Sequence, residues 1–297
     1  MATLYISIIL LCRVVQAIFN KRSSNEIKGI TMLVGYSSFK CGLSALLALL
    51  LILITGAGFA ADWRTVIIAA FSGITLFFAT FFSIYAMKSG TVSLSSMFGT
   101  AGLLVPLVAG VFLFDSKIHL MQWFGVGLFF VSAWLLIGSS KKIYTNFSFK
   151  TFLCLIGAML ANGGTMLAQQ MFTAYVPNGD VSVFSFLSFG IITVLGGIIY
   201  LFMLKKNSTH TSAPREKFPK ILIWCGVALA AAVFVINQLA TLCTAFVPPV
   251  ILFTFINGGG TIISTIVAAI LYKEKLSKRS IAGVLLGIIS LVIIKMF

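Results

Sequence analysis

The chain has 297 residues, of which 60% are hydrophobic and only 9% are charged. Soluble domains carry about a quarter charged residues, and a soluble fold of this length would need far more polar surface. The composition therefore excludes a soluble globular protein and predicts an integral membrane protein. The net charge of +15 comes mostly from basic residues in short segments between apolar runs, which is typical of membrane orientation and headgroup contact.

Ten apolar runs are long enough to be considered as membrane spans. A helix needs about 20 residues to cross a hydrocarbon core of ~30 Å. Polar segments such as "NKRSSNEIK", "YVPNGD" and "KKNSTHTSAPREKFPK" separate the runs. We expect a helix over each run, with a kink at Pro106 in the fourth and a start just after Pro219 in the eighth. The expected spans are Thr3–Phe19, Met32–Leu53, Val66–Met87, Val92–Phe114, Leu120–Gly138, Phe152–Ala174, Val183–Leu204, Ile221–Thr244, Val250–Tyr272 and Ile281–Met296.

All five cysteines lie in apolar runs, without a C-x-x-C motif or a neighbouring histidine. Buried thiols acting as small apolar groups fit this pattern better than a disulfide framework or a metal site. We therefore expect free cysteines, no metal and no cofactor. The first run lacks a basic leader and a small-residue cleavage site, so we expect it to be retained as a helix. The cysteines are Cys12, Cys41, Cys154, Cys225 and Cys243.

The chain also repeats itself. The segment "LLVPLVAGVFLFDSKIHLMQWFGVGLFFVSAWLLI" from Leu103 aligns with "TIISTIVAAILYKEKLSKRSIAGVLLGIISLVII" from Thr261 at a constant shift of 158. We expect one five-helix repeat over residues 1–138, a connecting loop over 139–150 and a second five-helix repeat over 151–297. Because five is odd, the second repeat enters the membrane in the opposite direction, which is typical of transporters that alternate access around a midplane site. The matched residues are Leu113 and Leu271, Lys117 and Lys275, Gly125 and Gly283, Ser132 and Ser290 and, at a slightly smaller shift, Gly73 and Gly226.

The repeated segments contain the turns "LFDSKIHLMQWFG" and "LYKEKLSKRSIAG", each followed by a last apolar run. Ten spans in two repeats with such turns resemble the EamA-like branch of the drug/metabolite transporter (DMT) superfamily over essentially the whole chain. The Gly-Glu pair that is usual in the family is replaced by Asp115-Ser116 in the first turn and by Lys273-Glu274 in the second. The resemblance implies an all-α transporter with a central cavity lined by the first, third, fourth, sixth, eighth and ninth spans. It leaves the cargo open.

Polar residues form two equivalent stripes inside the spans. Arg13, Gln16 and Asn20 are spaced i, i+3 and i+7, which places them on one helical face. The sixth span carries the same spacing at a shift of 149. Such residues in a membrane usually face a cavity or a partner, so we expect both stripes to line a substrate site. The second stripe consists of Asn162, Thr165 and Gln169.

Further polar residues inside the spans are weaker candidates. Asn237 and Gln238 in the eighth span and Asn257 in the ninth are expected to bind substrate. Asn257 lies in "INGGGTIIS", where the glycines favour close helix packing over an unwound helix. Hydroxyl stripes in the fourth and ninth spans could equally hold helices together. These stripes are Ser93, Ser96 and Thr100, and Thr254, Asn257 and Thr261.

Two cations lie at similar depth in the first two spans. Arg13 is eight residues before Lys21, or about 12 Å deep, and Lys40 is nine residues after Thr31, or about 13 Å deep. Lys40 could alternatively extend to the interface by snorkelling. No span contains a carboxylate. Because a cation in the bilayer needs water or a counter-charge, we expect an anionic or zwitterionic cargo at Arg13, with Lys40 adding its field.

Other function classes lack support. All six carboxylates lie in loops or at span ends and no catalytic motif is present, so we expect no enzyme. No filter or ring of like charge indicates a channel. We expect a carrier of a small polar metabolite, such as an amino acid or organic acid, working by alternating access through facilitated diffusion, exchange or coupling to the charge of the substrate. A flippase of a lipid-linked phosphate and a multidrug or cation exporter of the same fold stay open as alternatives.

Charge also predicts orientation. Sixteen of the 21 basic residues lie in loops after odd-numbered spans, three lie in even-numbered loops or the termini, and two lie within spans. Because positive loops stay cytoplasmic, this bias places both termini outside, whereas the family resemblance implies cytoplasmic termini. We expect a multi-pass protein of the plasma (inner) membrane. Its expected partners are the lipid bilayer and a small-molecule substrate, with no nucleic acid, because no basic groove with interleaved aromatics is present.

Overall fold

The computed structural model is helical in every element of the part that it describes, which is residues 2–27, 29–56, 58–59, 61–88, 98–99, 101–114, 118–137, 149–208, 219–260, 262–263 and 278–296. The expected all-α fold is confirmed. Most elements agree with an expected span to within a few residues, although α1 extends to Glu26. The elements are α1 (Ala2–Glu26), α2 (Ile30–Thr55), α3 (Trp63–Lys88), α5 (Leu104–Leu113), α6 (Leu120–Ile137), α7 (Phe149–Tyr175), α8 (Val181–Ser208), α9 (Lys220–Cys243), α10 (Pro249–Thr254), the π-helix η1 (Phe255–Gly259) and α12 (Lys278–Met296).

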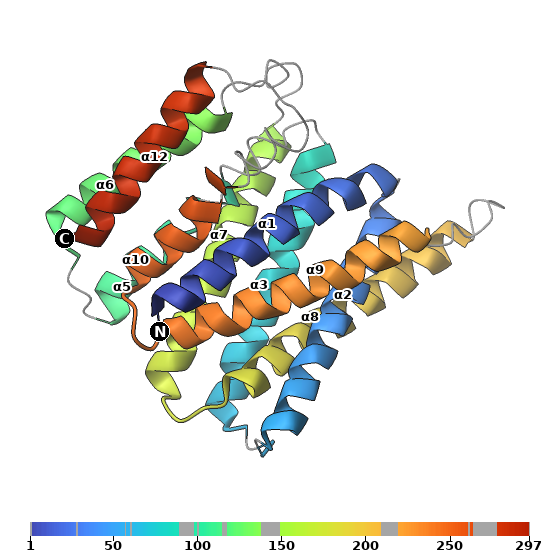
Figure 1. Ribbon diagram of the computed structural model, residues 1–297. Coiled ribbons are helices and arrows are strands. Elements are labelled where there is room, and N and C mark those ends of the chain that lie inside the picture. Colours follow the sequence, from blue (N-terminus) through green and yellow to red (C-terminus); the bar gives the residue numbers. More distant parts are fainter. Residues whose placement is uncertain are drawn as a thin grey trace.

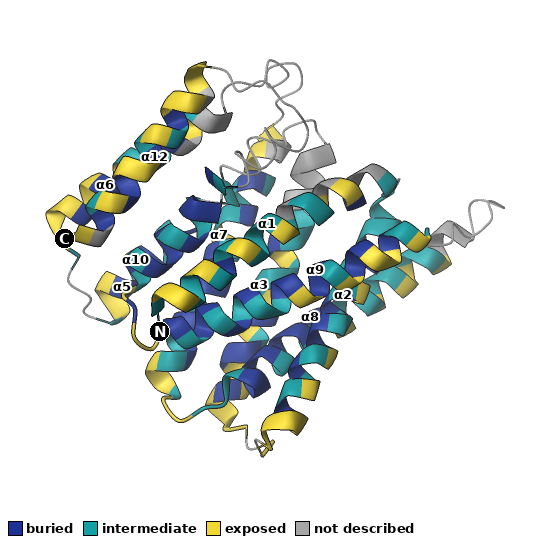
Figure 2. Ribbon diagram, viewed as in Figure 1, coloured by how far each residue is buried: buried dark blue, intermediate teal, exposed yellow. Residues whose placement is uncertain are grey.

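Six of these helices contain a segment long and apolar enough to cross a membrane, which makes this a multi-pass membrane protein. Exposed residues are distributed along these helices (Figure 2), and many of them are large and apolar, as contact with lipid requires. Ile54 and Trp224, for example, are 80% and 75% exposed. The spanning segments are Ala2–Asn20, Ile30–Thr55, Trp63–Phe82, Phe152–Tyr175, Val181–Lys205 and Lys220–Cys243.

The helices pack in a small number of close pairs (Figure 1). Helix α1 lies along α9, α2 along α8, α3 along α7, and α6 along α12, and the α6–α12 pair lies to one side of the others. Small residues allow these approaches, since apolar burial alone does not favour helix association in lipid. The Ser44 hydroxyl of α2, for example, donates to the Ala230 carbonyl of α9 at 3.1 Å. Ser132 of α6 donates to the Gly283 carbonyl of α12 at 2.7 Å.

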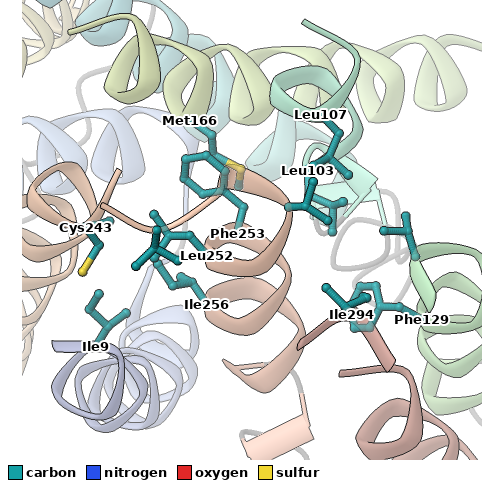
Figure 3. Packing of buried hydrophobic residues seen from close by; sticks show 14 of the residues in the cluster. Ile9, Leu103, Leu107, Phe129, Met166, Cys243, Leu252, Phe253, Ile256 and Ile294 are labelled. Atoms are coloured by element: carbon teal, nitrogen blue, oxygen red, sulfur yellow. The ribbon is translucent and has the colours of Figure 1, made fainter. Parts of the chain in front are cut away.

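A large apolar cluster, called here the central cluster, joins α1, α5, α6, α7, α9, α10, η1 and α12 (Figure 3). It extends to the end of the bundle where α1 begins and α9 ends, because the Tyr5 and Phe246 rings meet there at a centroid distance of 6.2 Å. Its buried members are Ile9, Leu103, Leu107, Val126, Phe129, Met166, Ile236, Ala240, Cys243, Val247, Val250, Leu252, Phe253, Ile256 and Ile294.

The fourth and ninth expected spans depart from a regular α-helix. The chain turns at Gly102 and Leu103 before α5 begins, because the Pro106 ring clashes with the carbonyl of the residue four positions earlier. The expected kink is therefore present. The ninth span begins as α10 and widens into the π-helix η1, which the sequence analysis does not predict. Several of the hydroxyls proposed in these two spans lie outside the described residues, namely Ser93, Ser96, Thr100 and Thr261.

Candidate functional site

A cavity of about 160 Å³ lies between α1, α2, α3, α7, α9, α10 and η1. Its lining combines cationic and amide side chains with an apolar wall. The structure brings together eight of the ten residues proposed from the sequence, and they come from five different elements. Two proposed residues, Asn20 and Gln238, do not line the cavity. The eight that do are Arg13, Gln16, Lys40, Asn162, Thr165, Gln169, Asn237 and Asn257.

Arg13 is held by neutral groups. Its Nη1 donates to Gln16 Oε1 at 3.0 Å, one turn along α1, and its Nη2 donates to Asn257 Oδ1 of η1 at 3.3 Å. The third nitrogen, Nε, is buried and has no hydrogen-bond partner among the described residues. The stem of the side chain packs over Gly260, where an added Cβ would lie 3.4 Å from Arg13 Cγ. The guanidinium is therefore fixed in direction while its charge is not neutralised by these partners.

Asn257 is itself positioned by the π-helix. Its Nδ2 donates to the Phe253 carbonyl at 3.0 Å and contacts Met166 Sδ of α7 at 3.6 Å. This leaves Oδ1 directed at Arg13. A π-helical turn inserts one extra residue per turn and is frequent at functional sites, which fits its position here. Residue 257 thus connects α1, α7 and η1 at the edge of the cavity.

Lys40 supplies the second cation of the lining from α2. Within the described part of the chain, its ammonium forms no hydrogen bond or salt bridge. The described carboxylates lie away from the cavity, since Glu26 ends α1, and Asp62 and Asp180 precede α3 and α8. Asp180 caps α8 by accepting from two backbone amides at 2.6 and 3.1 Å. The described lining therefore carries two formal positive charges and no carboxylate.

The second polar stripe, on α7, is tied to neighbouring helices. Gln169 Nε2 donates to Asn237 Oδ1 of α9 at 3.0 Å, and Asn237 Nδ2 donates to the Val233 carbonyl at 2.9 Å. The Thr165 hydroxyl pairs with that of Thr75 on α3 at 3.1 Å. These side chains line the cavity and also join α7 to α3 and α9.

Asn162 is also partly engaged. Its Nδ2 donates to the Gly99 carbonyl at 2.6 Å, which holds the segment before α5 against α7. Its Oδ1 has no hydrogen bond to the described residues and remains an acceptor on the cavity side. Asn162 therefore combines a packing contact with a position in the lining.

Gln238 holds α9 against α8 and does not line the cavity. Its Nε2 donates to Ser182 Oγ at 2.9 Å and its Oε1 accepts from Ser185 Oγ at 2.8 Å, both on α8. Consecutive helical residues do not share a face, so Gln238 cannot point where Asn237 points. Asn20 keeps the face of Arg13 but lies seven residues, about 10 Å, further along α1 and is exposed. Both residues therefore lie outside the proposed site.

The glycines of "INGGGTIIS" serve close packing. An added Cβ at Gly258 would lie 2.6 Å from the Phe129 ring of α6, and one at Gly259 would lie 3.0 Å from Leu10 of α1. The interpretation as a packing segment is therefore supported, although the helix also widens here. Together these contacts let η1 bring Asn257 up to Arg13.

Sequence reasoning misses the apolar wall of the cavity. Several of its residues also belong to the central cluster, among them Met166, Phe253 and Ile256 (Figure 3), so the cavity adjoins that cluster. No signal marks these residues among the other apolar residues of their spans. Thr80 of α3 is a polar exception that the pattern of hydroxyls in the spans could have suggested. The missed lining residues are Cys41, Leu76, Thr80, Met166, Val233, Ile236, Ala240, Phe253 and Ile256.

Gln238→Leu is expected to lower the thermal stability of the protein without changing its ligand binding. The substitution leaves the Ser182 and Ser185 hydroxyls without this partner, and such interhelical hydrogen bonds contribute about 0.6 kcal/mol on average and up to about 1.7 kcal/mol. Asn237→Leu is the matched variant, because it changes the neighbouring residue in the lining. Thermal unfolding with and without ligand measures both effects. Equal loss of ligand binding in the two variants would contradict the assignment.

No protein-family model matches this chain, and no curated protein matches it. One solved structure, described only as "Crystal structure of protein", superposes with a TM-score of 0.80 at 12% sequence identity. The match covers 99% of this chain and 96% of that chain. The likeness shows that the chain shares its whole fold with an experimentally determined structure, and it shows the fold alone.

Proposed function

We propose that this protein is a membrane transporter that moves a small anionic or zwitterionic metabolite by alternating access through the central cavity. The proposal depends mainly on the surroundings of Arg13, which lines the cavity and whose hydrogen-bond partners among the described residues are all neutral. A cation at this depth needs water or a counter-charge. A guanidinium suits a carboxylate or phosphate because it can donate two parallel hydrogen bonds.

The pattern of helix packing supports two related halves. If each of the first five expected spans corresponds to the span five positions later, the α1–α9 pair corresponds to α7–α3, while α2–α8 and α6–α12 correspond to themselves. All of these pairs are in contact. Gly73 of α3 packs against α8 and its counterpart Gly226 of α9 packs against α2, as the same exchange requires. This favours the inverted repeat that the sequence alignment suggests, and with it the EamA-like membership that we propose.

The position of the central cluster supports alternating access. Ile236, Phe253 and Ile256 line the cavity and also belong to the cluster. From them the cluster continues through Cys243 and Val247 to the end of α9. Packed apolar side chains thus separate the cavity from that end of the bundle. A carrier of this type needs one such barrier in each of its two states.

A thermal-shift screen of the purified protein tests the proposed function. Ligand that binds only the folded protein raises its melting temperature once the concentration exceeds the dissociation constant. Organic anions or zwitterions are expected to raise the melting temperature, whereas organic cations of the same size are not. Stabilisation by cations alone would favour a cation exporter. Stabilisation by lipid-linked phosphates alone would favour a flippase.

A further inference from the structure

Two unneutralised cations in one small cavity restrict the cargo further than a single arginine does. Arg13 projects from α1 and Lys40 from α2, and both line the same 160 Å³ space. The described lining residues include no carboxylate. A cargo with a single negative charge would leave one cation uncompensated, which is unfavourable in a membrane interior. We propose that the cargo is a small organic dianion, with one anionic group on Arg13 and the other on Lys40. This inference rests on the proposed transport function.

The two cations suit different roles. Arg13 is fixed by Gln16 and Asn257, so it presents a planar donor in a set direction. Lys40 makes no hydrogen bond to the described residues, and its flexible stem lets the ammonium follow the second anionic group. The arrangement thus combines one directional contact with one adaptable contact. It accepts dianions that differ moderately in length.

The positive charges of the lining disfavour a zwitterion more than its amides favour one. An ammonium group on the cargo would need acceptors, and the described lining supplies them through five amide side chains. Three of the five amide oxygens already accept from protein donors, since Gln16 and Asn257 accept from Arg13, and Asn237 accepts from Gln169. The positive charges of the lining also repel an ammonium. A second anionic group is attracted by the charges that repel an ammonium.

The size and the apolar wall of the cavity restrict the carbon skeleton of the cargo. A 150 Å³ apolar cavity in an engineered protein holds benzene, so a 160 Å³ cavity fits a cargo of roughly six to ten non-hydrogen atoms. Sugar nucleotides and lipid-linked phosphates exceed this size. Leu76, Val233 and Ile236 form part of an apolar wall that suits a short methylene chain between the two anionic groups. Four-carbon dicarboxylates have this size and character.

A matched set of four-carbon probes tests the inference by isothermal titration of the purified protein at about pH 7.5, where carboxylates are ionised. Succinate is the dianion, butyrate the monoanion and 4-aminobutyrate the zwitterion, with inorganic phosphate as a dianion without a carbon chain. Succinate is expected to bind at least about tenfold more tightly than each of the other three. Lys40→Gln is expected to remove most of that tenfold advantage over butyrate and to leave butyrate affinity unchanged.

Lys220→Gln serves as the control, because Lys220 is exposed at the start of α9 and lies outside the cavity lining. It should bind all probes as the parent protein does. Three results would overturn the proposal of a dianionic cargo. The parent could bind succinate and butyrate equally, or it could bind 4-aminobutyrate or phosphate more tightly than succinate. Lys40→Gln could also keep the full preference for succinate. The first two results, if Arg13→Gln abolished the binding, would overturn the dianionic cargo but not the proposed transport of anions or zwitterions. If the parent protein bound none of the probes, the result would overturn the dianionic cargo and would also count against the proposed function.

Discussion

Arg13→Gln is expected to abolish stabilisation of the protein by organic anions while leaving the ligand-free protein at least as stable as the parent. The substitution removes the directional donor for the cargo, and losing one partner of a desolvated charge pair costs about 2–5 kcal/mol, or roughly 30-fold or more in affinity. The ligand-free protein loses a cation whose hydrogen bonds to the described residues go to Gln16 and Asn257. Since an unneutralised cation is costly in a membrane, its removal offsets the lost hydrogen bonds.

The measurement is thermal unfolding over a range of succinate concentrations. Arg13→Lys should retain part of the stabilisation, because it keeps the charge but not the planar pair of donors. Arg22→Gln is the matched control, since Arg22 is exposed near the end of α1. An Arg13→Gln protein that responds to succinate as strongly as the parent would show that the cargo does not bind this guanidinium.

Gly163→Ala is expected to produce the largest loss of stability among single-methyl additions in α7. An added Cβ would lie 2.5 Å from Val105 Cβ and would meet the Gly102 carbonyl oxygen, where α7 crosses the turn before α5. Backbone atoms cannot move aside as a flexible side chain can. Overpacking of this kind costs about 1–3 kcal/mol or more. Displacement of the turn would also disturb Asn162, which bonds to Gly99.

Gly197→Ala in α8 provides the matched control. Both glycines lie inside long helices, so both substitutions gain about 0.5–1 kcal/mol of helix propensity. Apart from its chain neighbours and the backbone of α8, no atom of the described residues lies within 4 Å of an added Cβ at residue 197. The difference in melting temperature between the two variants therefore isolates the clash. Gly163→Ala should melt several degrees below the parent and Gly197→Ala at or above it. Similar melting temperatures for the two variants would contradict the close crossing of α5 and α7.

The helices could be predicted because long apolar runs leave few alternatives in a membrane. The expected Phe152–Ala174 and Ile221–Thr244, for example, differ from α7 and α9 by at most three residues at each end. The interruption before α5 also follows from one residue, Pro106. The π-helix η1 was not predictable in the same way. Its wider turn is supported by contacts of Gly258 with Phe129 and of Asn257 with Arg13, which come from helices distant in the sequence.

The polar half of the cavity could be predicted from spacing, whereas its apolar half could not. Arg13 and Gln16 stand out because charged and amide side chains are rare in spans. Gln238 stands out equally, and only the position of α8 shows that it bonds to serines there. In contrast, nothing in the sequence distinguishes Ile236, which lines the cavity, from the other isoleucines of the chain. Which apolar residues face a cavity depends on how the helices rotate about their axes, and that rotation is fixed by tertiary packing.

Counterflow of radiolabelled succinate in proteoliposomes tests most directly whether the cavity carries a small organic anion. Vesicles loaded with unlabelled succinate and containing the parent protein are expected to accumulate the external label transiently. Vesicles with Arg13→Gln, and vesicles without protein, should not accumulate it, whereas Arg22→Gln vesicles should match the parent. Accumulation at the parent rate in Arg13→Gln vesicles, or no accumulation with the parent protein, would contradict transport of this anion through the Arg13 cavity.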